Sequence, residues 1–165
     1  MPVTIDTPLL VVGPGPGALV VAKVAGGWGL PTLLVGHRSL GREEPVELSA
    51  DAIAVLTPHG VLEVMRPYLA AQSPPMIAPA VFEEGLKHHC VVDMNVTVYD
   101  GMDLVDAQPE GEGVTGVLTD GKIRWPLRAE VFVDAAGLPS ELSAAIVAGG
   151  AVADRVLAAR RERAR

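Results

Sequence analysis

Residues 7–35 read TPLLVVGPGPGALVVAKVAGGWGLPTLLV. The run at 7–12 is short, apolar and partly β-branched, and Gly-Pro-Gly ends it abruptly, which predicts a buried strand. Small and apolar residues fill 17–27, and the glycines at its far end favour a helix stop. Residues 31–35 form another short apolar run. The stretch therefore predicts strand, glycine turn, helix and strand, which is a βαβ unit.

The turn inside this unit has the spacing of a dinucleotide-binding loop. Gly13 permits a tight turn, Gly15 lets the backbone approach a pyrophosphate, and Ala18 takes the third position, where the helix packs on the strand. Pro16 and Gly17 complete the predicted cofactor turn, and free N–H groups at the helix start would face the anion. A plain strand-to-helix turn can share this spacing, but the flanking strands and helix favour dinucleotide binding.

The end of the second strand departs from the usual pattern. An acidic residue about 20 positions beyond the glycines usually holds the adenine ribose, whereas Gly36 stands here, followed by His37 and Arg38. His37 could donate to the ribose, Arg38 or Arg42 could reach a phosphate, and Arg38 would suit the 2′-phosphate of NADP. The alternative is a solvated loop, and for Arg42 both interpretations stand.

Helices and short strands alternate beyond this point. Two helical pieces, broken at 58–60, are expected within 49–71, with Ser49 as an N-cap. The further expected elements are a loop at 72–79, a helix at 80–89, strands at 95–99, 102–108, 113–119, 123–127 and 130–135, and a last helix at 140–165 capped by Ser140 or Ser143. Asp120-Gly121 is a strong hairpin signal. The chain is expected to form one α/β domain over 1–165, with a central parallel sheet and a small antiparallel meander.

Composition narrows the functional classes. The chain has 165 residues, 49% of them hydrophobic, and its 13 basic and 20 acidic residues give a net charge of −7, which argues against nucleic acid as a partner. Residues 7–22 are uncharged, but this stretch is shorter than the roughly 20 apolar residues of a spanning helix and rich in glycine and proline, so no membrane span is expected.

The cysteine and histidine content points to a reduced compartment and no metal. Cys90 is the only cysteine, so no internal disulfide can form and a cytoplasmic location is expected. His88, His89, Cys90 and Asp93 are metal-ligand types, but neighbouring residues point in different directions, so no metal site is predicted. No catalytic residue is assigned either.

Four pieces of sequence carry a family resemblance. They are residues 11–18 with the GxGPxx turn, 31–41 with a strand, a loop and Leu-Gly, the hairpin meander at 115–127, and VFVDAAG at 131–137. In this order they resemble the FAD-binding domain of the glutathione-reductase-like flavoprotein superfamily. The resemblance implies a Rossmann-like, three-layer α/β domain that binds FAD.

The resemblance also implies further cofactor contacts. A strand that contains Val96 would border the adenine with its backbone, and Ala135, Ala136 and Gly137 would pass close to the cofactor. The final helix would point its N-terminus toward the flavin and stabilise negative charge on the reduced ring. Gly150 in that helix would allow close approach to the cofactor, whereas the glycine pair by itself favours a packing or kink site in a helix.

The family's substrate or interface domain is missing. It usually lies between the Asp-Ala-x-Gly strand and the last helix, where this chain has only Leu138 and Pro139 between Gly137 and Ser140. The flavin ring would be uncovered, or covered by the helices at 48–79 or by another subunit. The chain has no C-x-x-C motif, which excludes a flavin-coupled disulfide relay.

These observations lead to a functional hypothesis with three alternatives. The hypothesis is an FAD-binding protein that stores, sequesters or carries flavin, forms a homo-oligomer and has no substrate chemistry of its own. The first alternative is a minimal FAD-dependent oxidoreductase, or a flavoprotein subunit whose partner chain supplies the substrate site. The second is an NADP-binding domain that uses Arg38. The third is a Rossmann-like structural domain that binds no dinucleotide.

Overall fold

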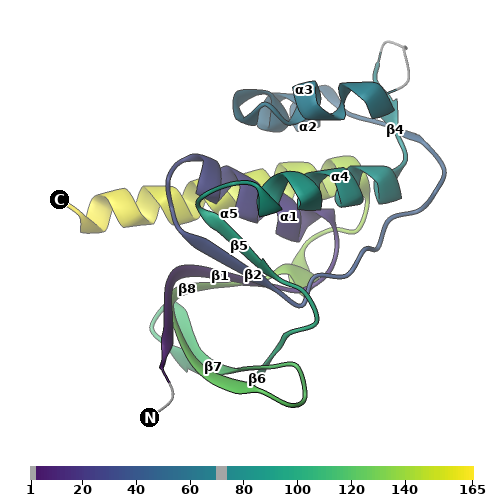
Figure 1. Ribbon diagram of the computed structural model, residues 1–165. Coiled ribbons are helices and arrows are strands. Elements are labelled where there is room, and N and C mark those ends of the chain that lie inside the picture. The colour runs from purple at the N-terminus through teal and green to yellow at the C-terminus, as the bar shows by residue number, and fades with distance from the viewer. Residues whose placement is uncertain (1–2, 70–73) are drawn as a thin grey trace.

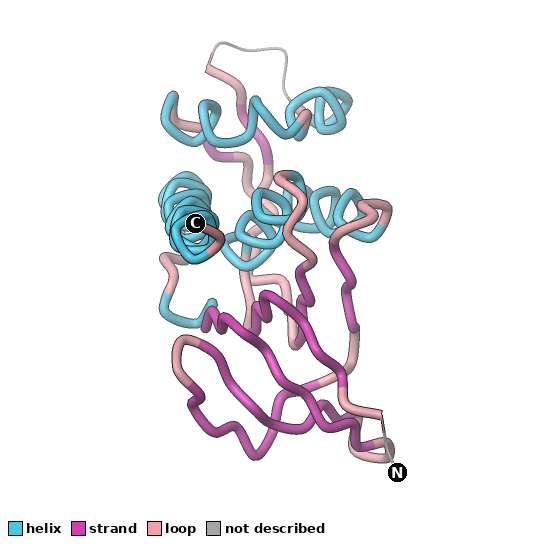
Figure 2. Tube along the Cα trace, turned by 90° about the vertical axis from the view of Figure 1, so that its left-hand side faces the viewer, coloured by secondary structure: helices cyan, strands magenta, loops and turns pink. Residues whose placement is uncertain are grey.

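The computed structural model describes residues 3–69 and 74–165. Helices lie above the strands in Figure 1, and an antiparallel meander curls beneath the parallel strands. Figure 2, turned by a quarter rotation, shows the same separation of helices from strands. The predicted Rossmann-like, three-layer α/β fold, with a central parallel sheet and a small meander, is therefore confirmed.

Four parallel strands lie side by side in a six-stranded sheet with the order β5-β2-β1-β8-β7-β6. They are β1 (Ile5–Val12), β2 (Thr32–Val35), β5 (Val96–Tyr99) and β8 (Arg124–Asp134). Val12 is in register with both Val35 and Asp134, and Val35 is in register with Tyr99. The carboxyl ends of all four strands therefore meet at one edge, and the βαβ unit predicted from 7–35 is present.

The meander consists of β6 (Asp103–Glu110) and β7 (Gly113–Thr119). β6 pairs antiparallel with β7, and β7 pairs antiparallel with β8. Sequence patterning predicted two strands, at 123–127 and 130–135, where the structure has one strand of 11 residues. β8 pairs with β7 over 124–129 and with β1 over 127–134, with a break in the pairing at Pro8. Residues 127–129 pair with both neighbouring strands, so β8 continues across the gap that was expected between residues 127 and 130.

Three helices cover the other side of the parallel strands. They are α1 (Pro16–Gly27), α4 (Pro79–Val91) and α5 (Leu142–Arg163). Every α1 residue from 16 to 26 is buried, which confirms the buried helix predicted there. α1 contacts both α4 and α5, so this helix forms the centre of the layer.

Two shorter helices lie outside this layer, α2 (Ala50–Leu56) against α5 and α3 (Val61–Met65) against α4. Short 3₁₀ turns follow them at Thr57–His59 and Arg66–Tyr68. The Ser49 hydroxyl accepts a hydrogen bond from the Ala52 N–H at 3.1 Å, which confirms the predicted N-cap. Residues 70–71, the predicted end of this helical region, lie outside the described part of the chain.

Part of the predicted loop at 72–79 pairs as a strand. β3 (Val46–Glu47) and β4 (Met76–Ile77) form a two-stranded antiparallel sheet. The Leu48 N–H also donates to the Pro75 carbonyl at 2.9 Å. The prolines of this segment excluded a helix correctly, but they leave the N–H groups of residues 76 and 77 free to pair.

The side chains of β1 divide the core in two. Leu9 and Val11 are fully buried against the helices, whereas Leu10 points to the opposite face, where it packs with Leu118 of β7 and Leu127 of β8. Alternation along a strand sends neighbouring side chains to opposite faces. The meander therefore buries the second face of the parallel sheet.

The start of α5 differs from the prediction. Glu141, not Ser140 or Ser143, is the N-cap, and its carboxylate accepts from the N–H groups of Ser143 and Ala144 at 3.1 and 2.7 Å. The Ser143 hydroxyl accepts instead from the Ser49 N–H and donates to the Glu47 carbonyl. Ser143 thus ties α5 to the segment before α2.

α5 is long and apolar enough to cross a membrane by length and composition alone. Its buried residues fall at helical spacing and pack against the rest of the fold, as in the core helix of a globular domain. They are Leu142, Ala145, Ile146, Gly149, Gly150, Ala153 and Leu157.

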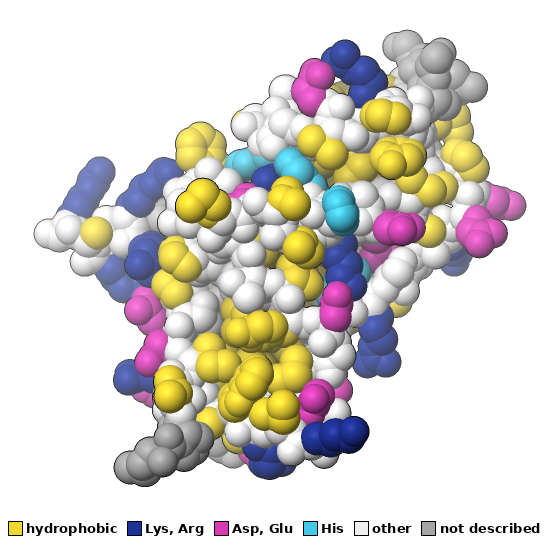
Figure 3. All heavy atoms as spheres, in the orientation of Figure 1, with side chains coloured by type: hydrophobic (Ala, Val, Ile, Leu, Met, Phe, Trp, Pro, Cys, Tyr) yellow, Lys and Arg dark blue, Asp and Glu magenta, His cyan; other side chains and the backbone are white. Residues whose placement is uncertain are grey.

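Hydrophobic side chains gather on the surface over the strands, below the helices in Figure 3. Val3 and Trp125, which line one surface pocket together with Ile5 and Tyr99, are exposed by 81 and 37% of their surface. Contiguous apolar surface of this kind often marks an interaction site. The predicted homo-oligomer remains a prediction.

Candidate functional site

The candidate site lies at the carboxyl edge of the parallel strands. β1 has β2 on one side and β8 on the other. The strand order therefore reverses at β1, because the chain first adds β2 and β5 on one side and later places β8 on the other side. In open α/β sheets, ligands bind in the crevice outside the strand ends at such a switch point. The glycine turn that follows β1 occupies this position.

Two glycines of the turn have backbone conformations that favour glycine. Gly13 has φ +126° and Gly15 has φ +93°. A Cβ on Gly13 would lie 3.1 Å from the Ala136 nitrogen, so the turn also needs glycine for close approach to the segment after β8. The Gly13 N–H donates to the Val35 carbonyl at 3.2 Å, which fixes the turn to the end of β2.

The first turn of α1 has no side-chain cap. Gly15 is the N-cap, no side chain caps the helix, and its first turn carries no acidic residue. Pro16 is at the first helical position and lacks an N–H, which leaves Gly17 and Ala18 as the first backbone donors. Uncapped N–H groups and the positive end of the helix dipole favour a bound phosphate.

The segment predicted to approach the cofactor lies beside this turn. It forms a short 3₁₀ turn, Ala135–Gly137, in which the Asp134 carboxylate accepts from the Ala136 N–H at 3.0 Å. Leu138 packs so closely on α1 that a Cβ on Gly17 would lie 2.8 Å from its Cδ1 atom. A Cβ on Gly137 would meet nothing within 4 Å, so this residue faces open space. The structure thus brings Ala135, Ala136 and Gly137 together with the glycine turn.

The loop after β2 lies on the other side of the turn. Gly36 has φ +67°, and the Gly15 N–H donates to the Arg38 carbonyl at 2.9 Å. A Cβ on Gly15 would lie 3.1 Å from Leu40 Cδ1, which places this half-exposed side chain directly over the turn. The side chains of Arg38 and Arg42 are exposed at this edge. The backbone of Arg38 therefore lies beside the glycine turn, whereas that of Arg42 is held by the first turn of α4. The cofactor contacts of Gly36 and of both arginines stay predictions.

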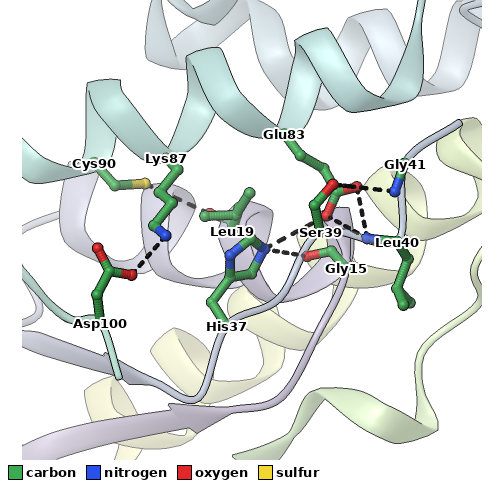
Figure 4. A network of polar contacts seen from close by, with 10 residues as sticks. All are labelled: Gly15, Leu19, His37, Ser39, Leu40, Gly41, Glu83, Lys87, Cys90 and Asp100. Carbon is green, nitrogen blue, oxygen red and sulfur yellow. Dashed lines mark hydrogen bonds and ion pairs between the residues drawn. The ribbon is translucent and has the colours of Figure 1, made fainter. Parts of the chain in front are cut away.

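His37 has a different place from the predicted ribose contact. Its side chain is only 3% exposed, and its Nε2 atom lies 3.2 Å from the Gly15 carbonyl oxygen and 3.5 Å from Glu83 Oε1. The ring lies between the glycine turn and α4 and points toward Gly15 and Glu83 (Figure 4). Its Nδ1 atom is also buried and has no partner among the described residues. His37 therefore holds the loop from inside and does not present itself to a ligand.

Sequence reasoning missed Glu83, the buried acid of this site. Glu83 is 1% exposed and lies on α4, with Phe82, Leu86 and Cys90 on the same buried side. The helical spacing of 83, 86 and 90 was a signal that this acid faces inward. At the same edge, Lys87 pairs with Asp100 at 2.5 Å and joins α4 to the end of β5.

Two predicted contacts lie away from the site. Val96 pairs with Thr32 at the amino end of β5, and its Cγ2 atom would be 2.4 Å from a Cβ on Gly26, at the far end of α1. Gly150 is in the middle of α5, where a Cβ would lie 2.7 Å from Val55 Cγ1. Gly150 thus serves helix packing, and Val96 lies at the wrong end of its strand to border a ligand at the glycine turn.

Two surface pockets of the fold lie away from the glycine turn. One of about 520 Å³ lies at the amino edge of the sheet near Asp6 and Glu112, and one of about 560 Å³ lies between α3 and α4. Neither is lined by residues of the glycine turn. Among residues 3–69 and 74–165, no group of three or more His, Cys, Asp and Glu side chains could hold a metal ion. Backbone geometry, and not a closed cavity, therefore marks the candidate site.

No family model and no curated protein matches the sequence. Solved structures do match the fold. One is p-nitrophenol 4-monooxygenase PnpA from Pseudomonas putida DLL-E4, with 18% identity, a TM-score of 0.64, and coverage of 79% of this chain and 40% of that chain. Another is the rebeccamycin biosynthetic enzyme RebC with reduced flavin, with 13% identity and a TM-score of 0.65. The match covers 84% of this chain and 34% of that chain.

The flavin-dependent monooxygenase PieE, solved in complex with FAD and substrate, also matches, with 17% identity, a TM-score of 0.58, and coverage of 78% of this chain and 30% of that chain. These similarities show that the chain has the fold found in flavin-dependent monooxygenases and related flavoproteins. It spans 30 to 40% of the length of these three structures.

Proposed function

We propose that the chain binds FAD, with the diphosphate at the glycine turn, as the flavin-holding part of an oxidoreductase-type protein. The observation that supports this most directly is the uncapped N-terminus of α1, which meets the Ala135–Gly137 turn at the switch point of the sheet. The flavoprotein folds that match the chain support the same ligand.

The residues present fit this cofactor. The N–H groups of Gly17 and Ala18 would bind the diphosphate, and the positive φ angles of Gly13 and Gly15 give the turn that precedes these groups its shape. Gly36 places no carboxylate at the ribose, so the loop after β2 would contact it through Arg38 or backbone groups. Bound FAD would supply hydride or electron transfer at its flavin ring. We propose that the substrate site comes from another segment or a partner chain.

Titration calorimetry with FAD and ADP tests this function. The wild-type chain should bind both ligands, because ADP contains the part of FAD that the turn would hold. Gly15→Ala should weaken both by about tenfold or more, because alanine is strained at φ +93° and crowds Leu40. Gly29→Ala is the matched control, since Gly29 has φ +89° but nothing within 4 Å of its Cβ position and lies at the other end of α1.

Binding of NADPH in preference to FAD would favour the NADP-binding alternative, in which Arg38 holds the 2′-phosphate. Failure to bind FAD, ADP and NADPH would leave a structural domain and overturn the proposal. Equal loss of binding in the two glycine variants would show that general destabilisation, and not the turn, explains the effect.

Storage of oxidised flavin is the second candidate function, and the cap of α5 favours it. The Glu141 carboxylate occupies the N–H groups of Ser143 and Ala144. If the flavin lies near this helix end, as in the family that the sequence resembles, a carboxylate there disfavours an anionic reduced ring. Storage predicts that NADH and NADPH reduce the bound flavin slowly, and that Glu141→Gln raises its reduction potential. Rapid reduction with steady turnover would favour the oxidoreductase.

A further inference from the structure

A buried carboxylate on α4 holds the loop that follows β2. Glu83 Oε2 accepts from the Leu40 N–H at 3.0 Å and from the Ser39 hydroxyl at 3.0 Å. Figure 4 shows the side chain reaching from α4 toward the loop, where these dashed contacts converge. Since Glu83 is 1% exposed, these donors stand in for the water that the carboxylate loses on burial.

The loop is pressed closely against this acid. A Cβ on Gly41 would lie 2.7 Å from Glu83 Oε2 and 2.4 Å from the Ala80 nitrogen. The Ala80 N–H also donates to the Arg42 carbonyl at 3.0 Å, so the first turn of α4 holds the far end of the loop. Burial of a carboxylate is costly unless all its partners stay in place, which ties the loop conformation to the contacts of Glu83.

The same loop holds the glycine turn on its other side. The Gly15 N–H donates to the Arg38 carbonyl, and the His37 Nε2 atom lies within hydrogen-bonding distance of the Gly15 carbonyl. A carbonyl oxygen only accepts, so Nε2 must carry a proton in this arrangement. Both backbone polar groups of Gly15 are therefore bound by the loop whose residues 37, 39 and 40 contact Glu83.

We propose that Glu83 is the positioning residue of the dinucleotide site, and this inference rests on the proposed function. Gly36 lacks the carboxylate that would bind the ribose directly. Glu83 acts instead through His37, Ser39 and Leu40, by holding the loop against Gly15 so that the diphosphate turn is formed before the ligand arrives. Preorganisation of this kind raises affinity without a direct contact, because the ordering cost is met before binding.

Binding of ADP and FAD to Glu83→Ala and Glu83→Gln tests the inference, together with amide hydrogen exchange measured without ligand. Glu83→Ala should weaken both ligands by about tenfold or more, since it leaves the donors of the loop unpaired. Exchange at Gly15 and Leu40 should accelerate, while exchange at Val21 in the middle of α1 stays unchanged. Glu83→Gln keeps an acceptor oxygen and should restore part of both effects. Glu84→Gln, on the exposed side of the same helix, should change neither.

Three results would overturn the positioning role. The first is wild-type affinity and wild-type exchange at Gly15 and Leu40 in Glu83→Ala. The second is faster amide exchange throughout α1 and β1 in Glu83→Ala, which would make Glu83 a general stabilising residue. If Glu83→Ala fails to fold, the same measurements on Glu83→Gln decide the question. The third, a wild-type chain that binds neither ADP nor FAD, would overturn the proposed function first and the positioning role with it.

Discussion

Lys23 is the only charged residue of α1, and it is almost buried at the end of the helix away from the glycine turn. Its ammonium group pairs with Asp93 at 2.9 Å, with side-chain exposures of 10 and 12%. Burial opposes the charge on Asp93, but the Asn95 N–H and the Lys23 ammonium outweigh it and hold the pKa of this carboxyl below its usual value. The pair lets an otherwise apolar helix keep one cation inside the fold.

The same cation affects two histidines. Burial, and then the Lys23 charge, lower the pKa of His59 and of His89 below the ordinary 6.5. A lowered pKa in the folded state means that the unfolded chain binds protons more readily. These histidines therefore contribute stability above about pH 6.5 that is lost as the pH falls through their folded-state pKa values.

Urea unfolding between about pH 7.5 and about pH 5.5 checks this prediction. The midpoint of the wild-type chain should fall as the pH decreases, and His89→Asn should flatten the dependence. His88→Asn, at the exposed neighbouring position, is the matched control and should keep the wild-type slope. A His89→Asn slope equal to that of the wild type would show that this histidine does not contribute.

Cys90 should be unreactive while the chain is folded. Burial raises the pKa of its thiol to about 12, against a smaller opposite effect of Lys23, and the side chain is fully buried. The thiolate is the reactive form, so a thiol reagent such as DTNB should modify Cys90 only after denaturation. Fast modification of the native chain would contradict the burial of this side chain.

Among whole elements, the contact between α1 and α5 depends on a glycine. A Cβ on Gly149 would lie 2.9 Å from the Gly17 carbonyl oxygen and 3.1 Å from Val20 Cβ. Alanine in place of glycine normally stabilises a helix by about 1 kcal/mol. Here the crowded backbone should reverse the sign, so Gly149→Ala is expected to lower the free energy of unfolding by about 1–3 kcal/mol.

The matched control for this variant is Gly85→Ala in α4. A Cβ on Gly85 would meet the end of the flexible Met65 side chain, 2.8 Å from its sulfur, and Met65 can move aside. Gly85→Ala should therefore be neutral or stabilising in the same denaturation measurement. A loss of stability in Gly85→Ala as large as in Gly149→Ala would mean that helix–helix crowding is not specific to the α1–α5 contact.

Elements defined by local chemistry were predictable from the sequence. The glycine turn, α1 and the hairpin at Asp120-Gly121 follow from short apolar runs and turn residues. The length of β8 was not predictable, because its continuity depends on β7 and β1 on opposite sides. The cap of α5 was missed because serine was the expected N-cap, whereas the Glu141 carboxylate reaches forward to the N–H groups of Ser143 and Ala144.

At the scale of the whole molecule, the candidate site depends on contacts between distant segments. The turn at 13–18 was evident from spacing, and its neighbours Ala135 and Ala136 came from the family resemblance. Glu83 was not found, because it acts on a loop more than 40 positions earlier in the chain. Local spacing identifies where a ligand can bind, whereas the residues that hold such a loop in place emerge only from the tertiary fold.

The absorbance spectrum of the purified chain, reconstituted with FAD and washed free of unbound cofactor, tests FAD binding most directly. The cofactor released by heat denaturation would then be identified. Flavin absorbance bands with stoichiometric release of FAD are expected, because the open N-terminus of α1 and the adjoining turns form a site for its diphosphate. A colourless chain that retains no FAD would contradict the proposed function.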